Sequence, residues 1–153
     1  MSDRYGDSTR AVKAVSSQPI PGEPVGPGPV LASAFHLSDD EGSEPNTYGR
    51  GSNPTWRQLE SALAQLEGAT AALSFSSGMA AITAALRVTA KPGSVLVVPA
   101  DGYYQVRRYA AESLAPLGVT VREATAEQIY QAAEYADVVL AETPTNPDRK
   151  SVV

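Results

Sequence analysis

The segment Phe75-Ser76-Ser77-Gly78-Met79-Ala80-Ala81 contains the residues of this 153-residue chain best suited to bind an anion. An apolar, strand-like stretch precedes it and an alanine-rich, helix-like stretch follows. The backbone N–H groups of a first helical turn have no intrahelical partners, and the helix dipole adds roughly half a positive charge there. A strand, a turn of small residues and a helix in this order therefore predict a phosphate site.

The elements around this segment follow from capping signals and periodicity. Asn53 is a good N-cap and Pro54 suits the first helical position, so a helix begins there and ends at Gly68. Its predicted apolar face consists of Leu59, Ala62, Leu63 and Leu66. Thr125 and Gln128 form a capping box for a later helix. The remaining pattern predicts strands at 71–75, 95–98, 119–122 and 138–141, and helices at 78–89, 104–114 and 125–135.

Strands that alternate with helices predict an α/β fold with a mostly parallel sheet flanked by helices. Ligands of such sheets bind beyond the carboxyl ends of the strands. Three candidate segments fall at these ends: Ser76–Met79, Asp101–Tyr104 and Glu142–Pro147. We therefore expect them to meet at one crevice.

Composition excludes several classes of function. The net charge of −5 and the scattered basic residues argue against a nucleic-acid or acidic-membrane partner. The chain has no cysteine and a single histidine, His36, so we expect neither a disulfide nor a metal site. No apolar run is long enough for a membrane helix, and the N-terminus lacks the apolar centre of a secretory signal. We predict a cytoplasmic protein.

The domain organisation is predicted from a change in amino-acid composition near residue 50. Residues 1–50 hold six of the 12 prolines and six of the 12 glycines, which is typical of an extended arm, with a short helix around Thr9–Val15 as one option. Residues 51–153 read as an α/β domain. The last residues resemble the approach to another element, so we expect this domain to be partial and truncated at its C-terminus.

The motifs resemble, in type and order, the cystathionine γ-synthase and γ-lyase family of pyridoxal phosphate enzymes. The match covers roughly residues 29–150. It rests on Tyr48-Gly49-Arg50-Gly51-Ser52-Asn53-Pro54-Thr55, Leu59-Glu60, Leu66-Glu67-Gly68, the Phe75–Ala81 segment, Asp101-Gly102-Tyr103 and Glu142-Thr143-Pro144-Thr145-Asn146-Pro147. The resemblance implies pyridoxal 5'-phosphate as cofactor and the large domain of a fold-type I enzyme.

The resemblance also implies a role for each candidate residue. Ser77, Gly78 and Met79 would hold the cofactor phosphate, and Tyr103 would stack on its pyridine ring. Asn146 would lie near the cofactor and the substrate carboxylate, while Glu142 receives no assigned role. Tyr48 and Arg50 would reach the phosphate of a neighbouring subunit, which implies a homodimer with shared active sites, assembled further into a tetramer.

The chain departs from the family pattern in two ways. After the stacking tyrosine it has Tyr104-Gln105-Val106 where the family commonly has Gly-Gly-Thr, and Ala34 replaces a hydroxyl residue. The family's reaction also needs a lysine that forms a Schiff base with the cofactor. The lysines here are Lys13, Lys91 and Lys150, none in a matching context, so the catalytic residue is unknown and we expect this chain alone to be inactive.

The implied function is a transsulfuration lyase that cleaves cystathionine by γ-elimination toward cysteine. Cystathionine γ-synthase is the first alternative, because both reactions share their early steps. A non-catalytic module that binds a phosphate-bearing ligand is the second, and an inert truncation product is the third. A serine nucleophile at Ser76 or Ser77 is rejected, because no Gly-x-Ser-x-Gly elbow surrounds them.

Overall fold

The computed structural model describes residues 6–14, 20–39 and 44–145. The chain divides into two compact units, Met1–Ser74 and Phe75–Val153, and each is described by itself. The sequence division into an arm over residues 1–50 and a domain over 51–153 stays a prediction.

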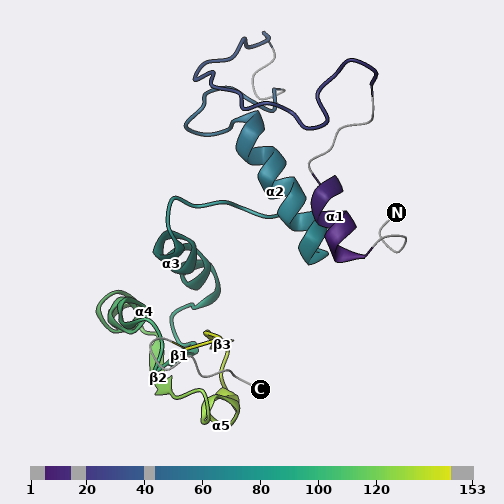
Figure 1. Ribbon diagram of the computed structural model, residues 1–153. Helices are drawn as coiled ribbons and strands as arrows, with labels where there is room; N and C mark the ends of the chain where they lie inside the picture. Colours follow the sequence, from purple (N-terminus) through teal and green to yellow (C-terminus); the bar gives the residue numbers. More distant parts are fainter. Residues whose placement is uncertain (1–5, 15–19, 40–43, 146–153) are drawn as a thin grey trace. The chain divides into compact units, whose positions relative to one another are not determined.

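Two helices and a set of loops make up the first unit (Figure 1). They are α1 (Asp7–Lys13) and α2 (Pro54–Glu67). The Asn53 side chain accepts the Thr55 N–H at 2.8 Å, and Gly68 ends the helix with a φ of 65°. The N-cap, the proline position and the terminating glycine are therefore confirmed. The predicted short helix in the arm also exists, two residues earlier than expected.

The predicted apolar face of α2 is only partly buried. Ala62 is 6% exposed, whereas Leu59 and Leu63 are 51% and 41% exposed. Periodicity fixed which residues share one helical face, but it could not indicate whether that face is covered.

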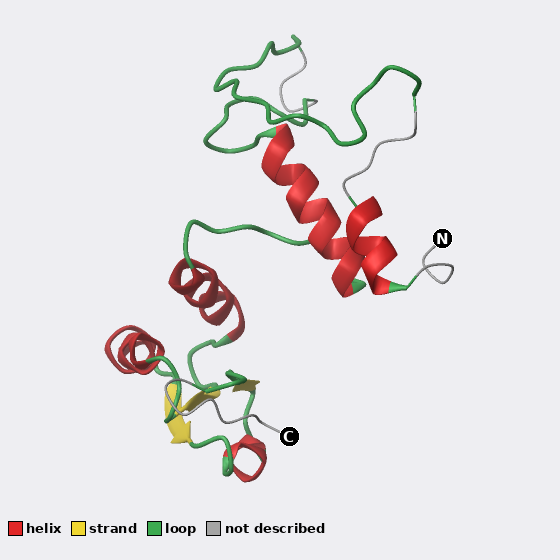
Figure 2. Cartoon of the chain, in the orientation of Figure 1, coloured by secondary structure: helices red, strands yellow, loops and turns green. Residues whose placement is uncertain are grey.

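In its described residues, 75–145, the second unit holds a three-stranded parallel sheet flanked by helices (Figure 2). In chain order its elements are α3 (Gly78–Thr89), β1 (Val95–Pro99), α4 (Tyr104–Tyr109), β2 (Thr120–Ala124), α5 (Ile129–Ala133) and β3 (Val138–Val139). The strand order is β2-β1-β3, with Val95 opposite Thr120 and Leu96 opposite Val138. The predicted α/β class and parallel sheet are confirmed.

The central strand β1 is buried on both faces because its side chains alternate. Leu96 and Val98 pack into one cluster with residues of α3 and α4, among them Leu86 and Val106. Val97 points the other way and packs with Ala124 and Ile129, under α5. A continuous apolar run such as Val95–Val98 is typical of a strand that is covered on both faces.

Four sequence predictions need correction. Residues 71–75 form no strand, because their backbone has no ladder partner among the described residues and the Ser74 N–H bonds to Glu60 instead. The sheet therefore has three strands in the described part of the chain, and its last strand is shorter than expected.

The helix that follows Tyr104 does not stop before Pro116. It continues as a π-helical turn (Ala110–Leu114) and a 3₁₀ turn (Ala115–Leu117), because proline is tolerated near the start of a turn, and it ends at Gly118. The Thr125–Gln128 capping box is half formed. Gln128 Oε1 accepts the Thr125 N–H at 3.3 Å, but the Thr125 hydroxyl is buried without a partner in the described residues, and α5 begins only at Ile129.

Candidate functional site

The N-terminus of α3 offers two unused backbone donors. Ser77 is the N-cap, and its hydroxyl accepts the Ala80 N–H at 3.1 Å while its carbonyl accepts that of Ala81. The amides of Gly78 and Met79 have no acceptor among the described residues. Apart from its chain neighbours and its own helix backbone, nothing lies within 4 Å of the place where a Gly78 Cβ would be, so the chain does not crowd this position. This is the geometry that an anion needs at a helix start.

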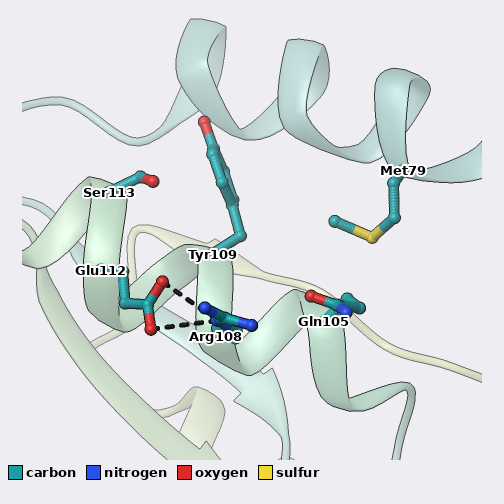
Figure 3. Close-up of a pocket in the computed structure, with 6 residues that line it drawn as sticks. All are labelled: Met79, Gln105, Arg108, Tyr109, Glu112 and Ser113. Atoms are coloured by element: carbon teal, nitrogen blue, oxygen red, sulfur yellow. Dashed lines mark hydrogen bonds and ion pairs between the residues drawn. The ribbon is translucent and has the colours of Figure 1, made fainter.

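Met79 also lines a pocket of about 300 Å³ between α3 and α4 (Figure 3). The other lining residues are Gln105, Arg108, Tyr109, Glu112 and Ser113. Met79 in the first turn of α3 and Gln105 in the first turn of α4 therefore line the same cavity.

Charge and polarity in this pocket come from one face of the helix that follows β1. Arg108 Nε donates to both carboxylate oxygens of Glu112, at 3.0 and 3.1 Å, and the Tyr109 hydroxyl is buried with no partner in the described residues. This pocket was not predicted from the sequence. The available signal was a row of polar residues at helical spacing beside the buried Val106 and Ala110.

Tyr103 lies just beyond the carboxyl end of β1, and a residue from beyond β3 holds its backbone. Its N–H donates to Glu142 Oε2 at 2.8 Å. Tyr103 is 39% exposed, and its ring meets the Tyr104 ring edge-on, with centroids 5.3 Å apart. The structure therefore joins two of the three segments that were expected to meet at the carboxyl ends of the strands.

Tyr48 and Arg50 lie in the first unit and contact each other. The Arg50 guanidinium carbon is 5.1 Å from the centroid of the Tyr48 ring. Tyr48 forms an antiparallel bridge with Ala34, and the Gly49 N–H donates to the Ser33 carbonyl at 2.7 Å. Both site side chains are exposed. Asn146, the last candidate residue, lies outside the described residues.

A parallel α/β sheet with candidate ligand groups at a helix start and at a strand end is typical of α/β proteins that bind a ligand at the carboxyl edge of the sheet. The sequence pattern described as "Cys/Met metabolism PLP-dependent enzyme" matches residues 8–152. The chain belongs to this family, so the resemblance found in the motifs is confirmed. The cofactor of the family is pyridoxal 5'-phosphate, as predicted.

Known proteins of the family cover most of this chain. A "Putative cystathionine gamma-lyase" of Streptomyces coelicolor is 43% identical over 93% of the chain and 37% of its own length. A "Cystathionine gamma-synthase" of Mycobacterium bovis is 34% identical over 93% of the chain and 38% of its own length. The crystal structure of cystathionine gamma synthase from Xanthomonas oryzae in complex with cystathionine matches with a TM-score of 0.79 and 30% identity, over 96% of this chain and 39% of that one. The chain thus spans less than two fifths of these relatives.

The residues present fit the cofactor's chemistry. Two free amides at a helix start suit a phosphate, and the half-exposed Tyr103 ring can lie against an aromatic ring. Within the described ranges, no group of three or more His, Asp or Glu side chains could hold a metal ion, and no helix is long and apolar enough to cross a membrane.

Proposed function

We propose that this chain carries the phosphate-binding and ring-stacking residues of a transsulfuration lyase that cleaves cystathionine by γ-elimination toward cysteine. The observation that carries the proposal is the pair of unused amides at Gly78 and Met79, in a first helical turn whose Met79 lines the same pocket as Gln105 at the start of α4. The 43% identity to the lyase of Streptomyces coelicolor supports the reaction.

Each candidate residue has a task in this proposal. Gly78 and Met79 donate their N–H groups to the cofactor phosphate, and the Ser77 hydroxyl, whose oxygen already accepts from Ala80, adds its own proton. Tyr103 restrains the ring by stacking. When bound, pyridoxal phosphate supplies an electron-withdrawing ring that stabilises negative charge on the substrate's α-carbon.

Tyr48 and Arg50 act on a second copy of the chain. A planar guanidinium holds phosphate oxygens in a bidentate manner, and stacking on Tyr48 at 5.1 Å orients Arg50 for that contact. We propose a homodimer with shared sites, assembled into a tetramer in the cytoplasm. Asn146 is proposed to lie near the substrate carboxylate.

Cystathionine γ-synthase is the alternative, because the synthases of Mycobacterium bovis and Xanthomonas oryzae also cover over nine tenths of the chain. An assay of the complete enzyme decides between them. Release of free cysteine from cystathionine supports the lyase, whereas formation of cystathionine from cysteine and an activated homoserine supports the synthase. The 153-residue chain, with lysines only at positions 13, 91 and 150, is expected to bind the cofactor without turnover.

Phosphate binding is tested by Gly78→Pro. Proline removes one N–H donor but suits the first helical position, and the extended backbone of Ser77 (φ −158°, ψ 158°) accepts a following proline. The dissociation constant for pyridoxal 5'-phosphate is expected to rise about tenfold or more, because a hydrogen bond to a charged group is lost.

Gly78→Ala is the matched control, since it keeps the N–H and its Cβ meets nothing within 4 Å beyond its chain neighbours and its own helix backbone. Pyridoxal, which lacks the phosphate, should bind both variants equally. If Gly78→Pro and Gly78→Ala bind pyridoxal phosphate with the same affinity, the phosphate does not lie at this helix.

Arg50→Ala tests the contact across subunits. It should raise the dissociation constant by one to two orders of magnitude, or about 1.5–3 kcal/mol, through loss of a charge-assisted contact. Arg122→Ala removes an exposed arginine elsewhere and serves as the control. Equal affinity of the two variants would exclude Arg50 from the site.

A further inference from the structure

We propose that Glu142 is a positioning residue that fixes the orientation of Tyr103 toward the cofactor ring. This inference rests on the proposed function, because it takes Tyr103 as the stacking residue. It assigns a task to an acidic side chain for which the motif alone gave none. The contact that carries it is the 2.8 Å hydrogen bond from the Tyr103 N–H to Glu142 Oε2.

The ring of Tyr103 needs such an anchor because packing does not enclose it. Tyr103 is 39% exposed, and its ring contact in the described chain is the edge of Tyr104. Tyr103 is also the N-cap of α4 without a side-chain cap, so its N–H takes no part in the helical hydrogen bonds, although its carbonyl accepts the Val106 N–H at 3.1 Å. Fixing the N–H fixes the direction in which the Cα–Cβ bond leaves the chain, and a carboxylate acceptor makes this a charge-assisted bond.

The loop before Tyr103 is shaped around the Glu142 carboxylate. A Cβ on Gly102 would lie 2.8 Å from Glu142 Oε2 and 2.6 Å from Pro99 Cγ, closer than real Cβ contacts allow. Gly102 is buried, and its φ does not lie in the left-handed region, so the glycine is required by space rather than by backbone conformation. The carboxylate occupies the room that the missing side chain leaves.

Two further side chains hold the same loop from other directions. Arg107 Nη1 donates to the carbonyls of Gly102 and Pro99, at 2.9 and 3.4 Å. Asp101 Oδ2 accepts the Ala126 N–H at 3.2 Å, from the segment after β2. These contacts restrain residues 99–102, and Glu142 restrains Tyr103 itself. The bond from Glu142 therefore acts on the ring most directly.

The test measures binding of two probes to the chain by titration calorimetry. Pyridoxine 5'-phosphate carries the ring and the phosphate but no aldehyde, so it reports non-covalent contacts, and inorganic phosphate reports the phosphate contacts without those of the ring. Glu142→Ala should weaken pyridoxine phosphate about tenfold, as expected for loss of an aligned aromatic contact, and should leave inorganic phosphate unchanged. Glu134→Ala, which removes an exposed carboxylate, should change neither.

Two more variants separate positioning from general disruption. In a Tyr103→Ala background, adding Glu142→Ala should cause no further loss, because the two residues act through one contact. Glu142→Gln keeps a neutral acceptor and should recover part of the affinity. If Glu142→Ala does not fold, Gly102→Ala gives the second measurement, since its Cβ displaces the carboxylate, and it should show the same selective loss.

Three outcomes would overturn the inference. The first is equal binding of pyridoxine phosphate by Glu142→Ala and Glu134→Ala. The second is an equal loss for both probes, and the third is a full additional loss in the Tyr103→Ala background. Failure of the unmodified chain to bind pyridoxine phosphate would instead overturn the proposed function, and the inference with it.

Discussion

Different forces stabilise the interior of each of the two units. In the second unit, side chains from α3, β1 and α4 form a buried core around Leu96 and Val98. In the first unit, the buried hydrophobic residues among those described are Ala62 and Ala64. Burial of apolar area stabilises roughly in proportion to that area, so the second unit has the larger hydrophobic contribution.

Polar contacts replace apolar burial in the first unit. The Asn53 side-chain amide donates to the carbonyls of Val30 and Ala32, at 3.0 and 3.3 Å, and the Thr55 hydroxyl accepts the Val30 N–H at 2.8 Å. Each such bond contributes only about 0.5–1.5 kcal/mol net, because water competes for the same groups. The comparison teaches that Gly78 and Tyr103 stand on a packed scaffold, whereas Tyr48 and Arg50 stand on a hydrogen-bonded one.

The largest expected effect is loss of a core side chain in the second unit. Leu96 is fully buried in the central strand, so Leu96→Ala should lower the free energy of unfolding by about 2–5 kcal/mol, measured by urea denaturation. Leu59→Ala in α2 changes a side chain that is 51% exposed and should cost well under half as much. Equal losses for the two variants would contradict the difference between the units.

The second effect is confined to the first unit. Asn53→Ala removes the N-cap of α2 and the donors to Val30 and Ala32, so it should cost about 1–2 kcal/mol. Hydrogen exchange should speed up over residues 55–57 and 30–32, while the amides of β1 keep their protection. Exchange that rises equally in β1 would show that the units unfold together.

Asn53→Asp separates the contribution of the helix cap from that of the hydrogen bonds to Val30 and Ala32. Aspartate keeps the acceptor for the Thr55 N–H but loses both donors, so α2 should stay protected while the segment around Val30 exchanges faster. Loss of protection in α2 as well would mean that the cap depends on the contacts to Val30 and Ala32.

Signals in the local sequence predicted the helices whose ends are set by residues close by in the chain. The helix at 78–89 was predicted with both ends correct, because a turn of small residues and the alanine-rich run after it are signals that act within a few residues. The segment 71–75 has an equally strand-like composition but is not a strand, because a strand also needs a partner, which is a property of the whole sheet.

The candidate site shows the same division. The unused amides at Gly78 and Met79 follow from helix geometry and could be predicted from the sequence. The bond between Glu142 and Tyr103 joins residues 39 positions apart, and the pocket beside Met79 depends on how α3 lies on α4. Neither arrangement has a local signal, so only the structure could reveal them.

The smallest predicted effect concerns the end of the first unit, where Glu60 holds Ser74. Hydrogen bonds from the Ser74 N–H and hydroxyl, both 2.7 Å, lower the pKa of Glu60 below its ordinary value, with a lesser contribution from Arg57. Because the pKa of Glu60 is lowered in the folded state, this contact stabilises the fold at pH values above the ordinary glutamate pKa. That stabilisation is lost as the pH falls through the lowered pKa.

Ser74→Ala should raise the pKa of Glu60 part of the way toward its ordinary value. Ser74→Pro should raise it further, because it also removes the N–H, which is the larger cause. An NMR titration of the Glu60 carboxyl measures both shifts, with Ser61→Ala as the control that leaves the Ser74 contacts intact. If the pKa is the same in all three variants, the contact does not form in solution and the first unit is looser at this end than the structure shows.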